Sequence, residues 1–221
     1  MTPDTRRIWE EVITAEDLDA HMESIGQADA NAKITREMFA DFPISMGRIL
    51  IPGCGTGQLF RLIGDIGEVF GYSTLVLNDV NEDFLGKAYD TCLSAGHTDA
   101  EPVKGAIEET DFEPCNGALM VLVLEHIDWK KGLESVLKTG ARNLYIIIQE
   151  QDIAATIVTT RKKLRPSIAK FIKVAHPQLI PREELTNFLA EQGYSCRKTY
   201  EREVQDGKKM IGMVFTTSAK T

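Results

Sequence analysis

The stretch RILIPGCGTGQLF, residues 48–60, decides the fold expected for this chain. Residues 48–51 are typical of a short buried strand, and a turn with three glycines follows them. Apolar residues then recur at helical spacing, at Leu59, Phe60, Leu62, Ile63 and Ile66. A strand, a glycine turn and a helix open a nucleotide-binding α/β unit, in which glycine permits positive φ and close approach of a ligand to the backbone. The free N–H groups at the start of such a helix can donate to a polar ligand.

The spacing of these glycines narrows the choice of ligand. The dinucleotide fingerprint G-x-G-x-x-G would need glycine at Gln58 or at Phe60, and no Gly-Lys-Ser/Thr follows to make a P-loop. The sequence G-C-G-T-G at 53–57 instead resembles motif I of the class I S-adenosylmethionine-dependent methyltransferases. An ordinary strand-to-helix turn is the alternative interpretation, and the rest of the chain has to decide between them.

Composition limits the class of protein. The chain has 221 residues, enough for one large domain, with 43% apolar and 26% charged residues, which is ordinary for a soluble globular protein. A net charge of −8 argues against nucleic acid as a partner. Residues 1–15 lack the apolar core of a signal peptide, and no apolar run approaches the roughly 18–20 residues that span a bilayer, so no membrane association is expected.

The four cysteines are scattered and include no C-x-x-C pair, which indicates reduced thiols in a cytoplasmic protein, with no disulfide frame and no zinc site. Residues 1–45 have a helical pattern, with Thr14 as a helix cap and a second helix at 28–40 that ends before Pro43. In the resemblance this segment is an N-terminal cap that closes over cofactor and substrate. Four of its side chains are open to either a lining or a packing role: Trp9, His21, Arg36 and Phe39.

The second expected strand, 73–78, leads to an acidic residue. Asp79 lies 22 residues after Gly57, where a carboxylate at the end of the second strand can accept hydrogen bonds from ribose hydroxyls. The family's motif II position is likewise acidic. Asp79 could instead cap the following helix, 82–95, but Asn81 can supply that cap and leave Asp79 free.

A short third strand, 101–104, precedes the loop Gly105-Ala106-Ile107-Glu108. In the family this loop holds the adenine, often through an aspartate, and Ala106 occupies that aspartate's position here. The resemblance therefore implies that Ile107 packs on the adenine face and that Glu108 is the candidate substitute for the missing carboxylate.

The fourth strand, 118–123, is a continuous apolar run, as in a central parallel strand. It ends in Leu124-Glu125-His126, which resembles the turn that faces the reacting methyl group in many small-molecule methyltransferases. A related subset binds a divalent metal through Glu-x-x-Glu-His, but Leu122 stands at the first of those positions, so no metal site is expected.

A helix at 130–138 and a fifth strand at 143–148 complete a βαβ rhythm. Because such connections are right-handed, the carboxyl ends of all the parallel strands meet at one edge of the sheet. The glycine turn, Asp79, Ile107 and the segment 123–126 are therefore expected together at that edge, which is the strongest argument for a ligand site.

The rest of the chain is less family-like. Residues 151–180 form an expected helical insert or lid with a basic cluster, Arg161-Lys162-Lys163-Leu164-Arg165, which either attracts an anionic substrate or is a solvated helix face. His176 either reaches the site from the substrate side or is structural. The tail, 181–217, is expected to contain a final helix at 182–192 and a hairpin of strands 195–203 and 210–216 that turns at Asp206-Gly207.

The sequence thus predicts one doubly wound, Rossmann-like α/β domain over 1–221, with a seven-stranded, mostly parallel sheet, an antiparallel last strand and an N-terminal helical cap. Its sections are the cap (1–45), the cofactor core (46–150), the insert (151–180) and the tail (181–217). The resemblance implies an S-adenosylmethionine-dependent enzyme acting on an oxygen or nitrogen of a small molecule. The candidate cofactor-binding residues are Pro52, Gly53, Cys54, Gly55, Gln58, Asp79, Val80, Ala106, Ile107, Glu108 and Val123; the candidate catalytic residues are His126, Glu125 and His176.

One departure from the family supports a competing hypothesis. The family has an acidic residue at the end of the first strand, which orients the methionine amine, but Ile51 stands at that position, followed by Pro52. The amine must then be held by backbone carbonyls or by the cap. Ile51 and Ala106 favour a second interpretation, a non-catalytic nucleotide-fold partner subunit. A third is an RNA or protein methyltransferase that docks through the basic insert.

Overall fold

The computed structural model describes residues 1–151, 166–174 and 177–217 and contains a seven-stranded sheet with the order β3-β2-β1-β4-β5-β7-β6. The strands are β1 (Met46–Pro52), β2 (Tyr72–Asp79), β3 (Ala100–Lys104), β4 (Gly117–Val121), β5 (Asn143–Gln151), β6 (Tyr194–Val204) and β7 (Lys208–Thr217). The first five are parallel, and β7 runs antiparallel between β5 and β6. The expected Rossmann-like fold with an antiparallel last strand is confirmed.

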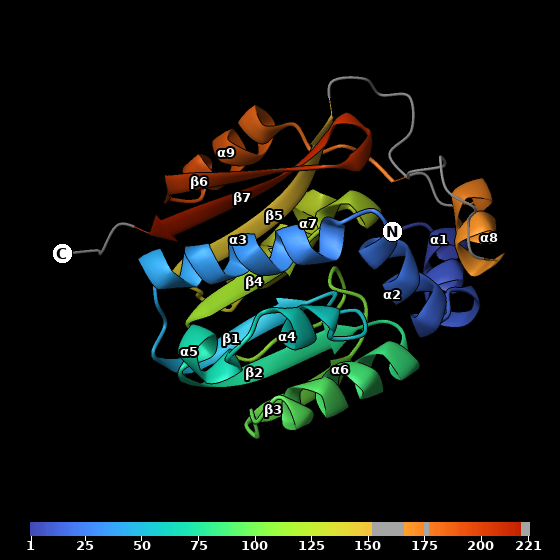
Figure 1. The fold of residues 1–221 in the computed structure, drawn as a ribbon. Helices are drawn as coiled ribbons and strands as arrows, with labels where there is room; N and C mark the ends of the chain where they lie inside the picture. The colour runs from blue at the N-terminus through green and yellow to red at the C-terminus, as the bar shows by residue number, and fades with distance from the viewer. Residues whose placement is uncertain (152–165, 175–176, 218–221) are drawn as a thin grey trace.

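Helices cover both faces of this sheet (Figure 1). One face packs against α3 (Gln27–Asp41), α4 (Gln58–Leu62), α5 (Ile66–Phe70) and α6 (Glu82–Ser94); the other packs against α7 (Trp129–Lys138) and α9 (Arg182–Glu191). Neighbouring residues of each central strand alternate between the two cores, as Ile49 and Leu50 do in β1. Burial on both faces explains the continuous apolar runs of the parallel strands.

Two expected elements differ from the structure. The helix after the glycine turn is divided into α4 and α5, because Gly64 has a φ of +89° and the Asp65 side chain caps the start of α5. The fourth strand ends at Val121 rather than at 123, because Leu122 takes a φ of +54° and residues Leu124–His126 form a 3-10 turn, η2. Asn81 caps α6, as expected.

The N-terminal region contains more than the two expected helices. Before α3 it comprises α1 (Pro3–Arg7), a π-helical turn η1 (Ile8–Val12) and α2 (Ala15–Ser24), which Thr14 caps as expected. These lie with α8 (Pro166–Val174) at one end of the sheet (Figure 1). A third apolar cluster joins them to the start of α6, through Ile8, Ile13, Ala15, Phe84, Ile168 and Phe171. We call these segments the cap.

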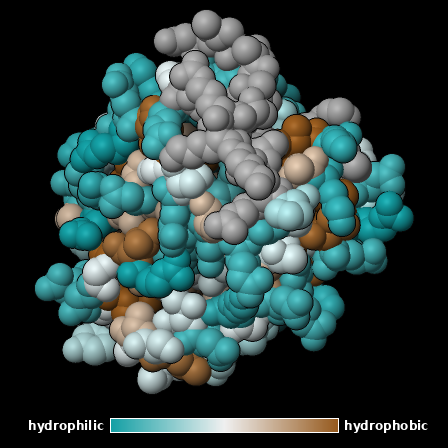
Figure 2. All heavy atoms as spheres, turned by 45° about the vertical axis from the view of Figure 1, so that its right-hand side comes forward, coloured by the Kyte–Doolittle hydropathy of each residue, from teal (hydrophilic) through white to brown (hydrophobic). Residues whose placement is uncertain are grey.

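Two features of the sequence lie outside the described residues, namely the basic cluster at 161–165 and His176. The division of the chain into cap, core, insert and tail stays a prediction. Within the described ranges, no helix is both long enough and apolar enough to cross a bilayer. The face seen in Figure 2 is mostly hydrophilic, with its apolar residues in small separate groups.

Candidate functional site

A cavity of about 240 Å³ lies at the carboxyl edge of the parallel strands. Its walls come from the glycine turn, the end of β2, the turn after β3, the end of β4 and the cap. The four segments that the sequence placed at one edge therefore border a single space. The cap contributes a further wall through Trp9, Asp19 and Phe171, and α3 contributes Asn31.

The glycine turn is shaped by three different requirements. At Gly53 a Cβ would collide with the side chain of Val123, and at Gly57 it would lie 2.7 Å from the backbone of Ala88 in α6. Gly55 has a φ of +57°, and a Cβ added there would meet no atom within 4 Å, so a side chain would occupy open space. Gly55 lines the cavity, and this open space is where a ligand can approach the backbone.

Asp79 joins the glycine turn to the end of β2. Its Oδ2 accepts from the Gly55 N–H at 2.9 Å, and its Oδ1 accepts from the Asn81 N–H at 2.9 Å. The sequence suggested a carboxylate free of such contacts, but in the structure it binds two backbone N–H groups. Each oxygen still retains a lone pair for a ligand hydroxyl. Burial raises the pKa of Asp79 to about 6, although these backbone N–H donors oppose that shift.

Asn78 positions the turn after β3. Its Nδ2 donates to the carbonyls of Val103 at 2.9 Å and Gly105 at 3.0 Å. Its Oδ1 has no partner, although Asn78 is fully buried and lines the cavity. Ile107 lines the cavity beside it, whereas Ala106 does not.

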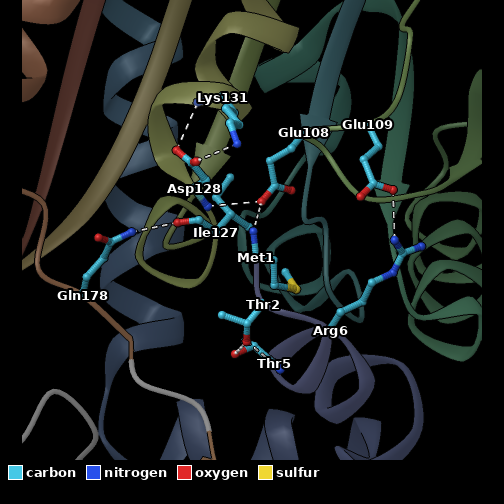
Figure 3. A network of polar contacts seen from close by, with 10 residues as sticks. All are labelled: Met1, Thr2, Thr5, Arg6, Glu108, Glu109, Ile127, Asp128, Lys131 and Gln178. Atoms are coloured by element: carbon cyan, nitrogen blue, oxygen red, sulfur yellow. Dashed lines mark hydrogen bonds and ion pairs between the residues drawn. The ribbon is translucent and has the colours of Figure 1, made fainter.

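Glu108 does not line the cavity and belongs to the contact network of Figure 3. Its Oε1 accepts from the Met1 ammonium at 2.5 Å and from the Asp128 N–H at 3.1 Å. In the same network Arg6 pairs with Glu109 at 3.0 Å. Glu108 thus joins the N-terminal segment to the core through its Oε1, while its Oε2 is buried without a partner; its assignment to the adenine stays a prediction.

The end of β4 carries a strained residue and a buried acid. Leu122 is the one residue other than glycine with positive φ among those described, and it lines the cavity. Such a conformation costs about 1–2 kcal/mol for a residue with a side chain. It turns the chain so that Glu125, 4% exposed, also lines the cavity. Glu125 Oε1 accepts from the Gln149 N–H at 2.8 Å, and its Oε2 has no partner.

His126 lies among aromatic rings. Its ring centroid is 5.0 Å from that of Trp9 in η1 and 5.7 Å from that of Phe171 in α8, both with edge-on geometry. Burial lowers the pKa of His126 to about 4, and its Nδ1 has no partner. Burial raises the pKa of Glu125 to about 7, with the Gln149 N–H opposing the shift. The two side chains of this turn therefore differ, because Glu125 exchanges protons near neutral pH and His126 stays neutral there.

Polar residues that the sequence did not select line the same cavity. Gln27 and Asn31 lie one turn apart on α3, and Gln27 Nε2 donates to Gln149 Oε1 at 2.6 Å. Asn31 is 4% exposed and its Oδ1 has no partner. The sequence did contain a sign of this polar site, namely two amide side chains four residues apart on an otherwise apolar face of the helix. The prediction of a helix that only packs against the sheet did not use it.

Asp19 of α2 faces the glycine turn. The Thr56 hydroxyl donates to its Oδ1, Gln58 donates to its backbone carbonyl at 3.1 Å, and Arg61 lies 4.0 Å from its Oδ2. Asp19 also lines the cavity. Its spacing from residues 56 and 58 gave no local signal, because the contact forms only in the folded chain.

The structure places eleven of the sequence-derived candidates on the cavity wall: Pro52, Gly53, Cys54, Gly55, Gln58, Asp79, Val80, Ile107, Val123, Glu125 and His126. Of the four cap residues left open, Trp9 and His21 line it, while Phe39 stacks on Tyr145 in the core at 4.0 Å between ring centroids. Ala106 and Glu108 do not line it. Among the described residues, no group of three His, Cys, Asp or Glu side chains could hold a metal ion.

No protein-family model and no curated protein sequence matches the chain. Solved structures do match it. Magnesium protoporphyrin IX methyltransferase ChlM from Synechocystis PCC 6803 with bound SAH has a TM-score of 0.65 at 13% identity, covering 97% of this chain and 93% of that chain.

Two further structures widen the comparison. The mitomycin 7-O-methyltransferase MmcR has a TM-score of 0.66 at 15% identity, covering 98% of this chain and 61% of that chain. The [4+2]-cyclase SpnF has a TM-score of 0.61 at 11% identity, covering 84% and 81%. At these identities the likeness concerns the fold, which is that of the class I methyltransferases.

Proposed function

We propose that this protein is an S-adenosylmethionine-dependent methyltransferase acting on a small molecule. The observation that carries the proposal is the single cavity bordered by the glycine turn, Asp79, Ile107 and the Glu125 turn. Bound there, S-adenosylmethionine would supply a methyl group on a sulfonium sulfur. The protein's part is to hold donor and acceptor in line, and orientation of this kind contributes about 7–11 kcal/mol to a transfer reaction.

The residues around the nucleoside end suit this cofactor. Asp79 keeps one lone pair on each oxygen for ribose hydroxyls. Val80 and Ile107 offer apolar surface to the adenine ring. Asn78 Oδ1 is a buried acceptor without a protein partner, which suits an exocyclic amino group and supports a role that Ala106 cannot fill.

The methionine end needs a partner for its amine, since Ile51 carries no charge. Asp19 supports that role, because it lines the cavity and the Thr56 hydroxyl fixes its Oδ1 against the glycine turn. The family's acid follows the first strand, whereas this acid belongs to the cap. Cofactor binding and closure of the cap would then depend on each other.

Proton transfer falls to Glu125 rather than to His126. A general base works best when its pKa lies near the operating pH, and the pKa of Glu125 is raised to about 7 by burial. The pKa of His126 is lowered to about 4, so its neutral ring is a weak base. His126 is better suited to form part of the apolar wall with Trp9 and Phe171.

Three other functions compete with this proposal. The non-catalytic partner subunit was favoured by Ile51 and Ala106, and Asp19 and Asn78 now offer substitutes for both missing contacts. The fold also hosts a protein named a cyclase, so methyl transfer itself has to be measured. The RNA or protein methyltransferase rested on the basic insert, and the net charge of −8 argues against it. A cytoplasmic location stays a prediction.

The test is calorimetric titration of the purified protein with S-adenosylmethionine and S-adenosylhomocysteine, followed by transfer of labelled methyl to a panel of small acceptors. We expect micromolar binding that Asp79→Ala reduces at least tenfold, because the ribose loses its acceptors. Asp65→Ala is the matched control, since Asp65 also accepts from two backbone N–H groups, at 2.9 and 3.2 Å, but lies outside the cavity. Absence of binding by folded wild-type protein would overturn the proposal.

A further inference from the structure

The end of the cavity nearest Glu125 presents hydrogen-bond acceptors that the protein leaves without donors. Asn31 Oδ1 and Glu125 Oε2 are both unpartnered, on side chains that are each 4% exposed. A chain of contacts fixes their surroundings, because Gln27 binds Gln149 at 2.6 Å and the Gln149 N–H binds Glu125 at 2.8 Å. A buried acceptor left unpaired costs about 1–3 kcal/mol, so these oxygens are suited to face donors on a bound molecule.

The charges around the cavity favour the same kind of molecule. Its described lining includes three carboxyl groups, from Asp19, Asp79 and Glu125. Two cationic groups also belong to lining residues, the ammonium of Met1, which pairs with Glu108, and the amine of Lys208, while Arg61 lies 4.0 Å from Asp19. Glu125 forms no ion pair within the described part of the chain. Asp19 and Asp79 serve the cofactor in the proposed function, so Glu125 is the carboxyl that faces the acceptor. A buried carboxylate is stabilised when a cation joins it, so Glu125 favours a positively charged acceptor over a carboxylate or phosphate.

Aromatic walls complete the arrangement. Trp9, His126 and Phe171 come from η1, η2 and α8, and their ring planes meet at 63–68° with centroids 5.0–5.7 Å apart. All three line the cavity. The three rings contact one another, so they form one aromatic wall, and Glu125 is the residue before His126. An ammonium group on the face of such a wall gains cation–π attraction.

We propose that the methyl acceptor is an amine, which enters as its ammonium ion and is held by Glu125 Oε2 and Asn31 Oδ1 beside the aromatic wall that Trp9, His126 and Phe171 form. This inference rests on the proposed function and names its substrate class. The expectation of an anionic acceptor came from the basic cluster at 161–165, which lies outside the described residues; the described wall supports the opposite charge.

The chemical step balances with the groups present. Glu125 Oε2 takes one proton from the ammonium nitrogen, which frees the nitrogen lone pair. That lone pair forms the new N–CH₃ bond while the S–CH₃ bond of the cofactor breaks. The electrons of the broken bond stay on sulfur, so the sulfonium becomes a neutral thioether. The product is a methylated ammonium ion, and Glu125 returns its proton to solvent after release.

The test compares three probes of similar shape and different charge, with the protein saturated with S-adenosylhomocysteine. The probes are 2-phenylethylamine, 2-phenylethanol and 3-phenylpropanoate, measured by calorimetry. We expect the amine to bind at least tenfold more tightly than the alcohol, and the carboxylate to bind most weakly. Equal affinities, a preference for the carboxylate, or no amine binding at millimolar concentration would overturn the proposal.

Variants locate the preference. Glu125→Gln keeps an oxygen for the Gln149 N–H and removes the charge, so we expect amine and alcohol to bind it equally. Asn31→Asp should strengthen amine binding and Asn31→Leu should weaken it. Glu134→Gln makes the same charge change at an exposed position of α7 and should leave the preference intact. An amine preference that persists in Glu125→Gln would contradict the assignment.

The readouts separate this inference from the proposed function. Wild-type protein that binds no S-adenosylhomocysteine contradicts the cofactor assignment, and the three probes then report on the cavity alone. Wild-type protein that binds S-adenosylhomocysteine but prefers the alcohol or the carboxylate keeps the proposed function and overturns the amine. Retained S-adenosylhomocysteine binding by Glu125→Gln shows that this variant is folded.

Discussion

At the scale of single residues, the buried carboxyl of Glu125 makes stability depend on pH. Its pKa is 4.5 when exposed and about 7 in the folded protein, so the folded state binds the proton more tightly. The contribution of Glu125 to the free energy of unfolding is therefore fully present below pH 4.5. It is lost as the pH rises toward 7, by up to about 3 kcal/mol. Asp79 shifts in the same direction, whereas the lowered pKa of His126 removes stability as pH falls from 6.5 to 4.

A difference measurement isolates Glu125 from these neighbours and from Lys208, which lines the same cavity. We expect Glu125→Gln to gain stability relative to wild type between pH 4.5 and pH 8, measured by urea unfolding at both pH values. Glu134→Gln, with its exposed carboxyl, should run nearly parallel to wild type. If Glu125→Gln also ran parallel, the carboxyl would titrate alike in the folded and unfolded states.

The glycine turn allows strain to be separated from loss of ligand space. Gly55→Ala adds a Cβ at a φ of +57° into open space on the cavity wall. Gly96→Ala adds one at a φ of +86°, also into open space, after α6 and away from the cavity. Both should lose about 1 kcal/mol of unfolding free energy. Only Gly55→Ala should also weaken S-adenosylhomocysteine binding, by tenfold or more; equal loss in both would mean that strain alone matters.

At the scale of elements, Asn81 joins a helix start to the cap. Its Oδ1 accepts from the N–H groups of Asp83 at 2.9 Å and Phe84 at 3.1 Å, and its Nδ2 donates to the Trp9 carbonyl at 2.7 Å. Asn81→Ala removes both functions and should lower the unfolding free energy by about 1–2 kcal/mol. Asn81→Asp keeps the helix cap but replaces the donor to Trp9 with a carboxylate oxygen.

We therefore expect Asn81→Asp to retain most of the thermal stability while it weakens cofactor binding several-fold, since η1 loses its contact with α6. Asn81→Ala should lose both. Melting temperature and calorimetric titration, measured on the same samples, check this separation. Equal cofactor affinity in wild type and Asn81→Asp would show that the Trp9 contact has no influence on the cavity.

The elements also show what local patterns can predict. The order of strands and helices followed from periodicity and from the right-handed crossover rule, because both act through residues close in sequence. The break between α4 and α5 was missed, since the apolar spacing continues across it while the positive φ of Gly64 ends the first helix. The early end of β4 was missed because leucine gives no signal of positive φ at Leu122.

At the scale of the whole molecule, the side of the cavity formed by the strand ends was predictable and the side formed by α3 was not. Gly55, Asp79 and Ile107 each follow a parallel strand, so topology alone brings them together. Gln27 and Gln149 meet across a separation of 122 residues, because packing against the sheet determines where α3 lies. Glu108 was assigned to the adenine from its position in a motif, and its contact with Met1 gave no local signal, because 107 residues separate the two.

The last prediction concerns the third apolar cluster, through which the cap packs against the core. Phe171 contacts Trp9 and His126 in the wall of the cavity. Phe188 on α9 packs against Trp129 at 5.4 Å between ring centroids and lies outside the cavity. Removing either ring should cost up to about 3 kcal/mol of unfolding free energy. Only Phe171→Ala also removes a cavity wall, so calorimetry should show weaker binding of S-adenosylhomocysteine and of 2-phenylethylamine, with both affinities nearly unchanged in Phe188→Ala. If Phe171→Ala and Phe188→Ala lost the same affinity for both ligands, the effect would not depend on a place in the cavity wall. The cap and the sheet would then behave as one cooperative unit.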